Sequence, residues 1–222
     1  MPGEPACDAL TVRPLTAHDA AWSASLHKRT LSVGLFPALG QRFLRRYHRS
    51  FVDSTTGVAI IACSNGRPAG FVLGVLDPEA HRLETVRRHG LGLGVVGVSA
   101  ILLRPALLIR FGRTRLRSYL RVLWRQLRPR QRSGTAGLHA HAAVLSHIAV
   151  EDSARGLGIG AMLVDAVTEA ARDAGTRTVQ TSTVDRASFY ESLGWTVSGA
   201  GRTFDGATEH RLTRSVSVDG AR

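Results

Sequence analysis

A glycine-rich turn between an apolar run and an apolar helix has the residue types that bind phosphate. Arg155-Gly156-Leu157-Gly158-Ile159-Gly160 follows residues 144–150 and leads into a helix predicted over 158–174. Glycines let the backbone approach a ligand closely, and the first turn of a helix leaves N–H groups without intrahelical partners. Together with the helix dipole, these donors favour a phosphate or pyrophosphate. The alternative is a turn that only lets the helix pack tightly on a sheet.

The spacing of this turn and a second segment narrow the interpretation. G-x-G-x-G departs from the dinucleotide fingerprint G-x-G-x-x-G, and the Gly-Lys-Ser/Thr of a P-loop is missing. Ile148-Ala149-Val150 followed by Arg155-x-x-Gly158-x-Gly160 resembles the acyl-coenzyme A signature R/Q-x-x-G-x-G/A of the GNAT superfamily of N-acetyltransferases. Downstream, Phe189-Tyr190-Glu191-Ser192-Leu193-Gly194-Trp195 is similar to that superfamily's F-Y-x-x-x-G-F segment. The resemblance is strong over residues 142–214 and weak over 10–78.

The resemblance implies acetyl-coenzyme A (acetyl-CoA) as the cosubstrate, and no metal. The loop amides would hold the pyrophosphate, and backbone groups of Ile148 and Val150 would bind the pantetheine arm. Thr183 stands where the superfamily usually has Asn before the short helix. The residues expected at acetyl-CoA are Ile148, Ala149, Val150, Arg155, Gly156, Leu157, Gly158, Ile159, Gly160, Thr183 and Tyr190.

Acyl transfer to an amine needs a neutral amine, a stabilised oxyanion and a proton for the departing thiolate. The resemblance implies that Tyr190 protonates the sulfur of coenzyme A and that a backbone N–H within residues 148–150 meets the oxyanion. His139, His141 and His147 are the candidates for the general base, because the pKa of histidine suits that role. We take His147 as the candidate. A metal site at His139 and His141 is disfavoured because no third ligand is evident.

The acceptor site is expected between the first helices and an insertion in the chain. His27, Phe36 and Pro37 are the candidate acceptor contacts. Four arginines lie on the second predicted helix, where a solvated basic face is the simpler interpretation and an anion site the alternative; they are Arg42, Arg45, Arg46 and Arg49.

The elements that must position these residues alternate between strand and helix. Asn65-Gly66 predicts a hairpin, Thr16 and Asp19 predict the start of a helix, and a second helix is predicted from near Pro37. A short helix is expected over 187–193. The expected fold is α/β of the GNAT type, a single domain over 8–218 with a mixed, mostly antiparallel central sheet flanked by helices. Strands are predicted at 10–14, 58–63, 71–76, 142–150, 178–184, 195–198 and 210–216.

The net charge of +12 is concentrated in residues 79–133, which contain thirteen arginines and two acids. Arginines and leucines recur there at helical spacing, so we expect a basic amphipathic helical insertion after the third strand. It could serve as a lid over the acceptor, lie on anionic lipid, or pack as a dimer or core element. The rest of the chain is nearly neutral, so no nucleic-acid partner is expected.

The expected function is transfer of an acetyl group from acetyl-CoA to a primary amine of a small molecule, such as an amino sugar or a natural-product intermediate. One alternative is a longer-chain N-acyltransferase working at a membrane surface or on a lipid-linked acceptor. Another is a non-catalytic GNAT-like protein that binds nucleic acid or regulates. With two unpaired cysteines, no apolar run of about 20 residues and an N-terminus unlike a secretory signal, we expect a cytoplasmic protein, with contact at the inner face of the membrane left open.

Overall fold

One mixed sheet organises the chain, and the computed structural model describes residues 10–31, 35–102, 142–203 and 206–216. The strand order within these residues is β1-β2-β3-β4-β5-β7-β6. Every neighbouring pair is antiparallel except β4 with β5, which confirms the predicted mixed, mostly antiparallel sheet. The strands are β1 Thr11–Pro14, β2 Gly57–Ser64, β3 Arg67–Val75, β4 Ala143–Val150, β5 Thr178–Thr183, β6 Thr196–Arg202 and β7 Thr208–Ser215.

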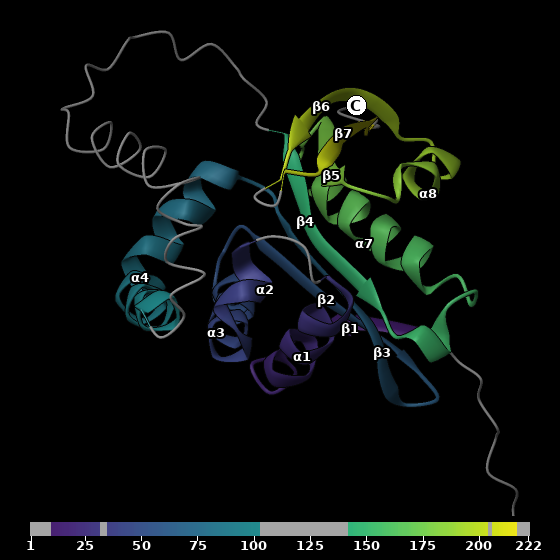
Figure 1. Cartoon of the computed structure of the whole chain (residues 1–222). Helices are drawn as coiled ribbons and strands as arrows, with labels where there is room; N and C mark the ends of the chain where they lie inside the picture. Colours follow the sequence, from purple (N-terminus) through teal and green to yellow (C-terminus); the bar gives the residue numbers. More distant parts are fainter. Residues whose placement is uncertain (1–9, 32–34, 103–141, 204–205, 217–222) are drawn as a thin grey trace, which may run out of the picture.

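Helices cover both faces of this sheet (Figure 1). The first three helices pack on one face, and α7 packs on the other with α8 near its N-terminal end. α4 lies outside α3, farther from the sheet. The helices are α1 Ala20–Thr30, α2 Leu35–Leu39, α3 Gln41–Val52, α4 Pro78–Leu102, α7 Ile159–Asp173 and α8 Ala187–Ser192.

Two glycines of β3 let α7 approach the sheet closely. A Cβ on Gly70 would lie 3.1 Å from a side-chain methyl carbon of Ile159 and 3.2 Å from one of Leu163, and a Cβ on Gly74 would lie 3.2 Å from Val167. The apolar residues of α7 recur at helical spacing, and their buried face joins the larger of the two core clusters. This packing fixes the start of α7, and therefore the glycine-rich turn, against the end of β4.

The second predicted helix is broken in two. Gly40 has a φ of 92°, and its amide donates to the carbonyl of Pro37, so the chain turns between α2 and α3. The prediction of one helix from near Pro37 is therefore wrong, because the apolar spacing of Phe43, Tyr47 and Phe51 continues only on the C-terminal side of this turn.

The insertion after the third strand is helical where the structure describes it. Asp77 caps α4, since its Oδ1 accepts from the amides of Glu79 at 2.9 Å and Ala80 at 3.0 Å. The Glu84 carboxylate then accepts from Ser54 and Thr55 at the end of α3, which ties α4 to α3. The predicted arginine and leucine pattern from 103 to 133 lies outside the described residues. No described helix combines the length and hydropathy needed to cross a bilayer.

Candidate functional site

A fork between β4 and β5 is the central feature of the site. The parallel pairing is confined to Ala143–Leu145 of β4 and Val179–Thr181 of β5, although β4 continues to Val150. At this point β4 also contains a bulge, because Leu73 pairs with His147 and Gly74 pairs with Leu145. A bulge bends a strand and increases its twist. The backbone edge of residues 146–150 that faces β5 is therefore left open to bind a ligand.

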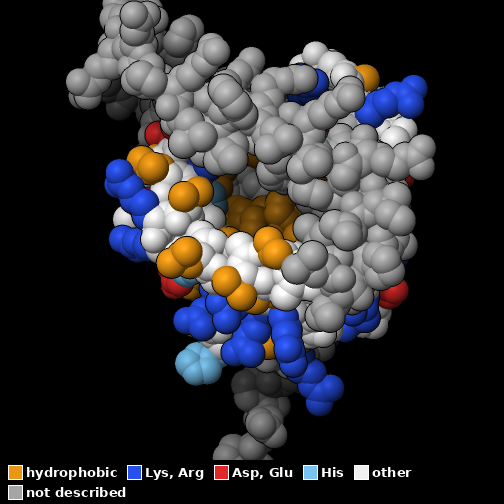
Figure 2. All heavy atoms as spheres, turned by 60° about the vertical axis from the view of Figure 1, so that its left-hand side comes forward, with side chains coloured by type: hydrophobic (Ala, Val, Ile, Leu, Met, Phe, Trp, Pro, Cys, Tyr) orange, Lys and Arg blue, Asp and Glu red, His pale blue; other side chains and the backbone are white. Residues whose placement is uncertain are grey.

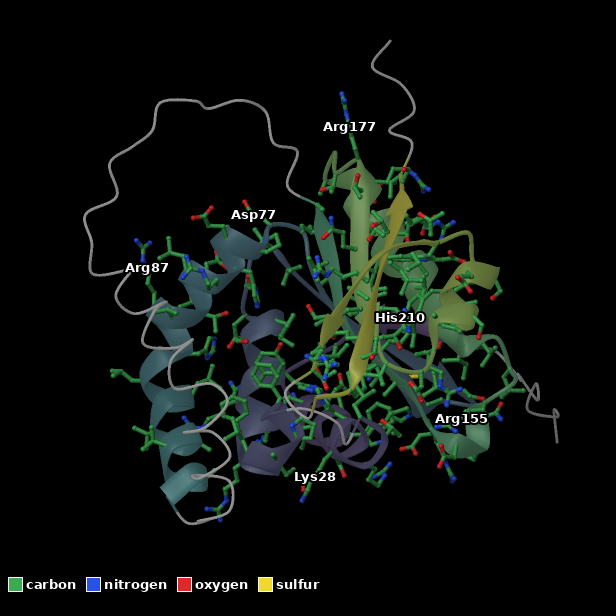
Figure 3. The ribbon with its side chains drawn as sticks, turned by 45° about the horizontal axis from the view of Figure 1, so that its top comes forward. Lys28, Asp77, Arg87, Arg155, Arg177 and His210 are labelled. Carbon is green, nitrogen blue, oxygen red and sulfur yellow. The ribbon has the colours of Figure 1, made fainter. Side chains whose placement is uncertain are left out.

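The glycine-rich turn lies at the open end of β4. Gly156 and Gly158 have φ values of 83° and 78°, and a Cβ on either would meet no atom within 4 Å. Among the described residues, no acceptor is recorded for the amides of residues 156–161. Arg155 lies beside this turn (Figure 3) and is held by the carboxylate of Asp152 at 2.7 Å. Free amides at a helix N-terminus with open space before them fit a pyrophosphate.

Tyr190 lies at the base of the fork. Its side chain is 4% exposed and packs edge-on against Trp195. Burial raises the pKa of Tyr190, and a hydrogen bond with Thr181 partly counteracts the shift. The hydroxyl of Thr181 donates to the carbonyl of Leu145 at 3.0 Å, and Leu145 is the last residue of β4 that pairs with β5. The Tyr190 hydroxyl therefore remains protonated at neutral pH, next to the point where the strands separate.

The other predicted cofactor residues occupy three positions around this fork. Ile148, Ala149 and Val150 follow the bulge and pair with β3. Thr183 ends β5, and its hydroxyl accepts from the amide of Arg186 at 3.2 Å. Its side chain therefore helps to begin the turn into α8. Leu157, Ile159 and Gly160 continue the turn into α7, and a Cβ on Gly160 would lie 3.1 Å from the ring of Phe189.

On the opposite face of the sheet, His147 reaches an aromatic wall formed by α2 and α3. Its Nε2 lies 3.2 Å from the hydroxyl of Tyr47, and the two rings meet edge-on. Phe36 stacks on Tyr47 with ring centroids 4.6 Å apart and meets His147 edge-on at 6.2 Å. His147 as a residue is partly exposed, but burial of its imidazole, together with the neighbouring His27, lowers its pKa to about 3. The imidazole is therefore neutral at pH 7.

Behind His147 lies a buried hydrogen-bonded chain. The rings of His147 and His27 are 4.6 Å apart, and His27 Nδ1 is 2.9 Å from His48 Nε2. His48 Nδ1 is 2.9 Å from the hydroxyl of Ser23. Burial lowers the pKa of His27 to about 4 and that of His48 to about 2. Since the rings of His27 and His48 are both neutral, one of them must donate the hydrogen bond and the other must accept it. The donors and acceptors along the Ser23–His48–His27 chain can therefore be arranged in either of two directions.

The structure therefore brings three predicted residues together and adds three that the sequence reasoning missed. His27 and Phe36 converge with His147, whereas the recorded contact of Pro37 is the turn to Gly40. His139 and His141 lie outside the described residues. Among the described residues, no group of three His, Cys, Asp or Glu side chains could hold a metal ion. The missed residues are Ser23, Tyr47 and His48, and the only available signal was the spacing of four between Ser23 and His27 in one helix.

Comparison with known proteins agrees with this geometry. Residues 122–197 match the sequence model described as an acetyltransferase (GNAT) domain. No curated protein sequence matches the chain significantly.

Several solved acetyltransferase structures share the fold. Ard1 from Thermoplasma volcanium is similar at a TM-score of 0.56 and 14% identity, over 94% of this chain and 99% of that one. An aminoglycoside 6'-acetyltransferase type Ii is similar at 0.56 and 12% identity, over 93% and 97%. The ribosomal-protein-S18-alanine N-acetyltransferase from Escherichia coli is similar at 0.53 and 14% identity, over 96% and 98%. At these identities the likeness shows the fold.

Proposed function

We propose that the chain is an acetyltransferase of the GNAT type that transfers the acetyl group of acetyl-CoA to a primary amine of a small molecule, which the match of residues 122–197 to the GNAT domain model supports. The observation that carries this proposal is the fork between β4 and β5. A cradle of free amides lies at its open end, a protonated tyrosine at its base, and a neutral histidine on β4, with its side chain on the other face of the sheet. An amino sugar or a natural-product intermediate would suit such a site.

The residues present fit acetyl-CoA, which supplies an activated acetyl thioester. The amides of residues 156–161 would bind its pyrophosphate, and Arg155 would add a positive charge at the same place. The open backbone edge of β4 at residues 146–150 would bind the pantetheine arm. Phe189 and Gly160 hold α8 against the start of α7, which keeps Tyr190 close to this arm.

His147 is proposed to take the proton that leaves the amine. A neutral imidazole has a lone pair for this proton, and His147 is the partly exposed member of the histidine group. Its pKa of about 3 keeps the imidazole in this neutral form at pH 7. Tyr47 orients the ring through its hydroxyl, 3.2 Å from Nε2, and in the tautomer whose Nε2–H donates to this hydroxyl the lone pair lies on Nδ1 and can take the proton.

Tyr190 is proposed to protonate the departing sulfur. Its raised pKa keeps the proton available at neutral pH, and Thr181 holds the hydroxyl in place. A backbone N–H of residues 148–150 on the open edge of β4 would stabilise the oxyanion. Preorganised donors of this kind need no rearrangement during the reaction.

The aromatic wall supports an amine acceptor. Phe36, Phe43 and Tyr47 are in mutual ring contact, and Phe36 and Tyr47 also meet His147. Aromatic faces attract a cationic amine before it loses its proton. The test is release of the coenzyme A thiol on a panel of amino sugars, polyamines and amino acids. Amine-dependent release that is lost in His147→Gln and in Tyr190→Phe supports the proposal. Equal release with and without every amine overturns it.

A second candidate is transfer of a longer acyl chain. Figure 2 shows a hollow on the α4 side of the molecule with hydrophobic side chains at its floor, which is a suitable surface for an alkyl chain. Profiling acyl-CoA donors of increasing chain length on the best amine separates the two candidates. A maximum of kcat/KM at acetyl-CoA supports the first, and a maximum at long chains supports the second.

A further inference from the structure

The outer face of α3 carries a stripe of arginines directed away from the histidine group. Residues at spacings of three and four share one face of a helix. With His89 and Val96 of α4, these arginines line a cavity of about 660 Å³. The guanidinium of Arg46 lies against Gly92, where a Cβ would be 2.5 Å from Nη1. The stripe consists of Arg42, Arg45, Arg46 and Arg49.

Within the part of the chain that the structure describes, no acidic group balances the positive charge of this stripe. Among the described residues, no ion pair joins any of the four arginines to an acidic side chain. The nearby acid Asp53 is approached by His89, at 3.3 Å. The sequence from 85 to 150 contains no Asp or Glu at all. Like charges at these spacings, beginning in the first turn of α3, destabilise the helix. An external anion would offset that cost.

The neighbouring helix presents large apolar side chains to solvent. Leu91 is 90% exposed, immediately before the glycine that Arg46 touches. The other members follow one another along α4 at spacings of three to five residues. Figure 2 shows exposed hydrophobic side chains on the α4 side of the molecule, with Lys and Arg side chains gathered along their edge. The apolar stripe consists of Leu83, Val86, Leu91, Val95 and Val98.

We propose that α3 and α4 dock on a membrane leaflet that contains anionic phospholipids. The arginine cavity takes lipid phosphates, and the apolar stripe of α4 enters among the acyl chains. An anionic leaflet offers phosphates to the arginines and acyl chains to the apolar stripe at the same time, as it does for interfacial helices with a basic flank. A soluble phosphate or a nucleic acid would leave the apolar stripe in water, and a second copy of this chain would bring more positive charge to the same surface. The proposal does not depend on which amine is acetylated.

The test is co-sedimentation of the full chain with vesicles of phosphatidylcholine alone and of phosphatidylcholine mixed with phosphatidylglycerol. We expect binding to the mixed vesicles only. Replacing the four arginines of α3 by Gln should weaken that binding at least tenfold, because each basic residue near the surface contributes roughly 1 kcal/mol. The matched control removes the same charge elsewhere by changing Arg67, Arg172, Arg177 and Arg202 to Gln. Arg177, for example, projects from the distant end of the molecule (Figure 3), and we expect less than a threefold effect.

A second pair of variants tests the apolar stripe. High salt screens the attraction between charges, so the vesicle binding that remains at high salt reports the apolar contact. The double variant Leu91→Ser with Val95→Ser should abolish this remaining binding, whereas the control Val12→Ser with Val197→Ser should retain it. Circular-dichroism melting verifies that each variant is folded. Equal binding to both kinds of vesicle, or equal losses in variant and control, overturns the proposal. The proposal is also overturned if the chain binds a DNA oligonucleotide or pyrophosphate more tightly than the mixed vesicles, and if the arginine variant loses that binding while its binding to vesicles is unchanged.

Discussion

At the scale of single residues, three neutral histidines beside a tyrosine are the most distinctive feature of the molecule. His27 and His48 are buried almost completely, and His147 alone keeps an exposed part. His147 and His27 are each candidates from the sequence, but their contact could not be predicted, because His27 lies in a helix and His147 in a strand 120 residues later. The sequence gives no sign that His48 and Ser23 belong to the site, because a polar side chain can be buried only where a hydrogen-bond partner meets it, and here that partner is distant in sequence.

His147→Gln should lower kcat about a hundredfold with little change in the KM for acetyl-CoA. Glutamine keeps a polar side chain of similar reach but cannot accept the proton, and general base catalysis contributes about 10²–10⁴-fold. Steady-state kinetics on the best amine measure the effect. His18→Gln is the control, since that residue is exposed at the start of α1. An unchanged kcat would exclude His147 as the base.

The buried histidines also predict how stability depends on pH. Their pKa values in the folded chain, about 4 for His27, 2 for His48 and 3 for His147, lie below the 6.5 of an unfolded histidine. The unfolded chain therefore binds more protons below pH 6.5, and stability falls as the pH is lowered from 6.5 towards 4. The slope for each histidine approaches roughly 1.4 kcal/mol per pH unit.

Urea unfolding at pH 7.5, 6 and 5 measures this slope. His48→Gln should remove part of it, because one of the three groups no longer takes up a proton on unfolding. A free energy of unfolding that is the same at pH 7.5 and pH 5 would contradict the neutral state of the group.

At the scale of elements, the turn types and helix ends were the most predictable parts. Asn65-Gly66 forms the predicted hairpin with φ values of 51° and 71°, and α7 differs from its predicted bounds by one residue at each end. The break at Gly40 was not predicted, since a single glycine in an apolar periodic stretch is also tolerated within a helix. The bulge in β4 was not predicted either, because it depends on the register with β3.

Gly70→Ala should destabilise the protein by about 1–3 kcal/mol. The new Cβ would lie 3.1 Å from the carbonyl of Ala149 and against Ile159 and Leu163, so either α7 or β4 must shift. Because both elements bear the site, acetyl-CoA binding should weaken too. Gly199→Ala, in β6 with no atom within 4 Å of its Cβ, is the control. Thermal melting compares the two, and equal melting temperatures would show that α7 does not depend on this close approach.

At the scale of the whole molecule, the fold class followed from two short motifs, whereas the role of the charge did not. The net charge of +12 indicated an anionic partner but not its location. The structure shows where this charge lies: the exposed arginines of α3 and the exposed apolar residues of α4 are on neighbouring helices, whereas His48 of α3 is buried. The proposed acetyl transfer and the proposed docking therefore use different residues of α3.

The most direct test of this account is calorimetric titration of the full chain and two glycine variants with acetyl-CoA. Gly158 and Gly175 lie at opposite ends of α7, both with positive φ and both with open space around a Cβ. Gly158→Glu and Gly175→Glu therefore impose the same backbone strain and the same charge, but only the first fills the amide cradle. The account predicts one-to-one binding that Gly175→Glu retains and Gly158→Glu loses by at least a hundredfold. No binding by the unmodified chain, or equal losses in both variants, would contradict it.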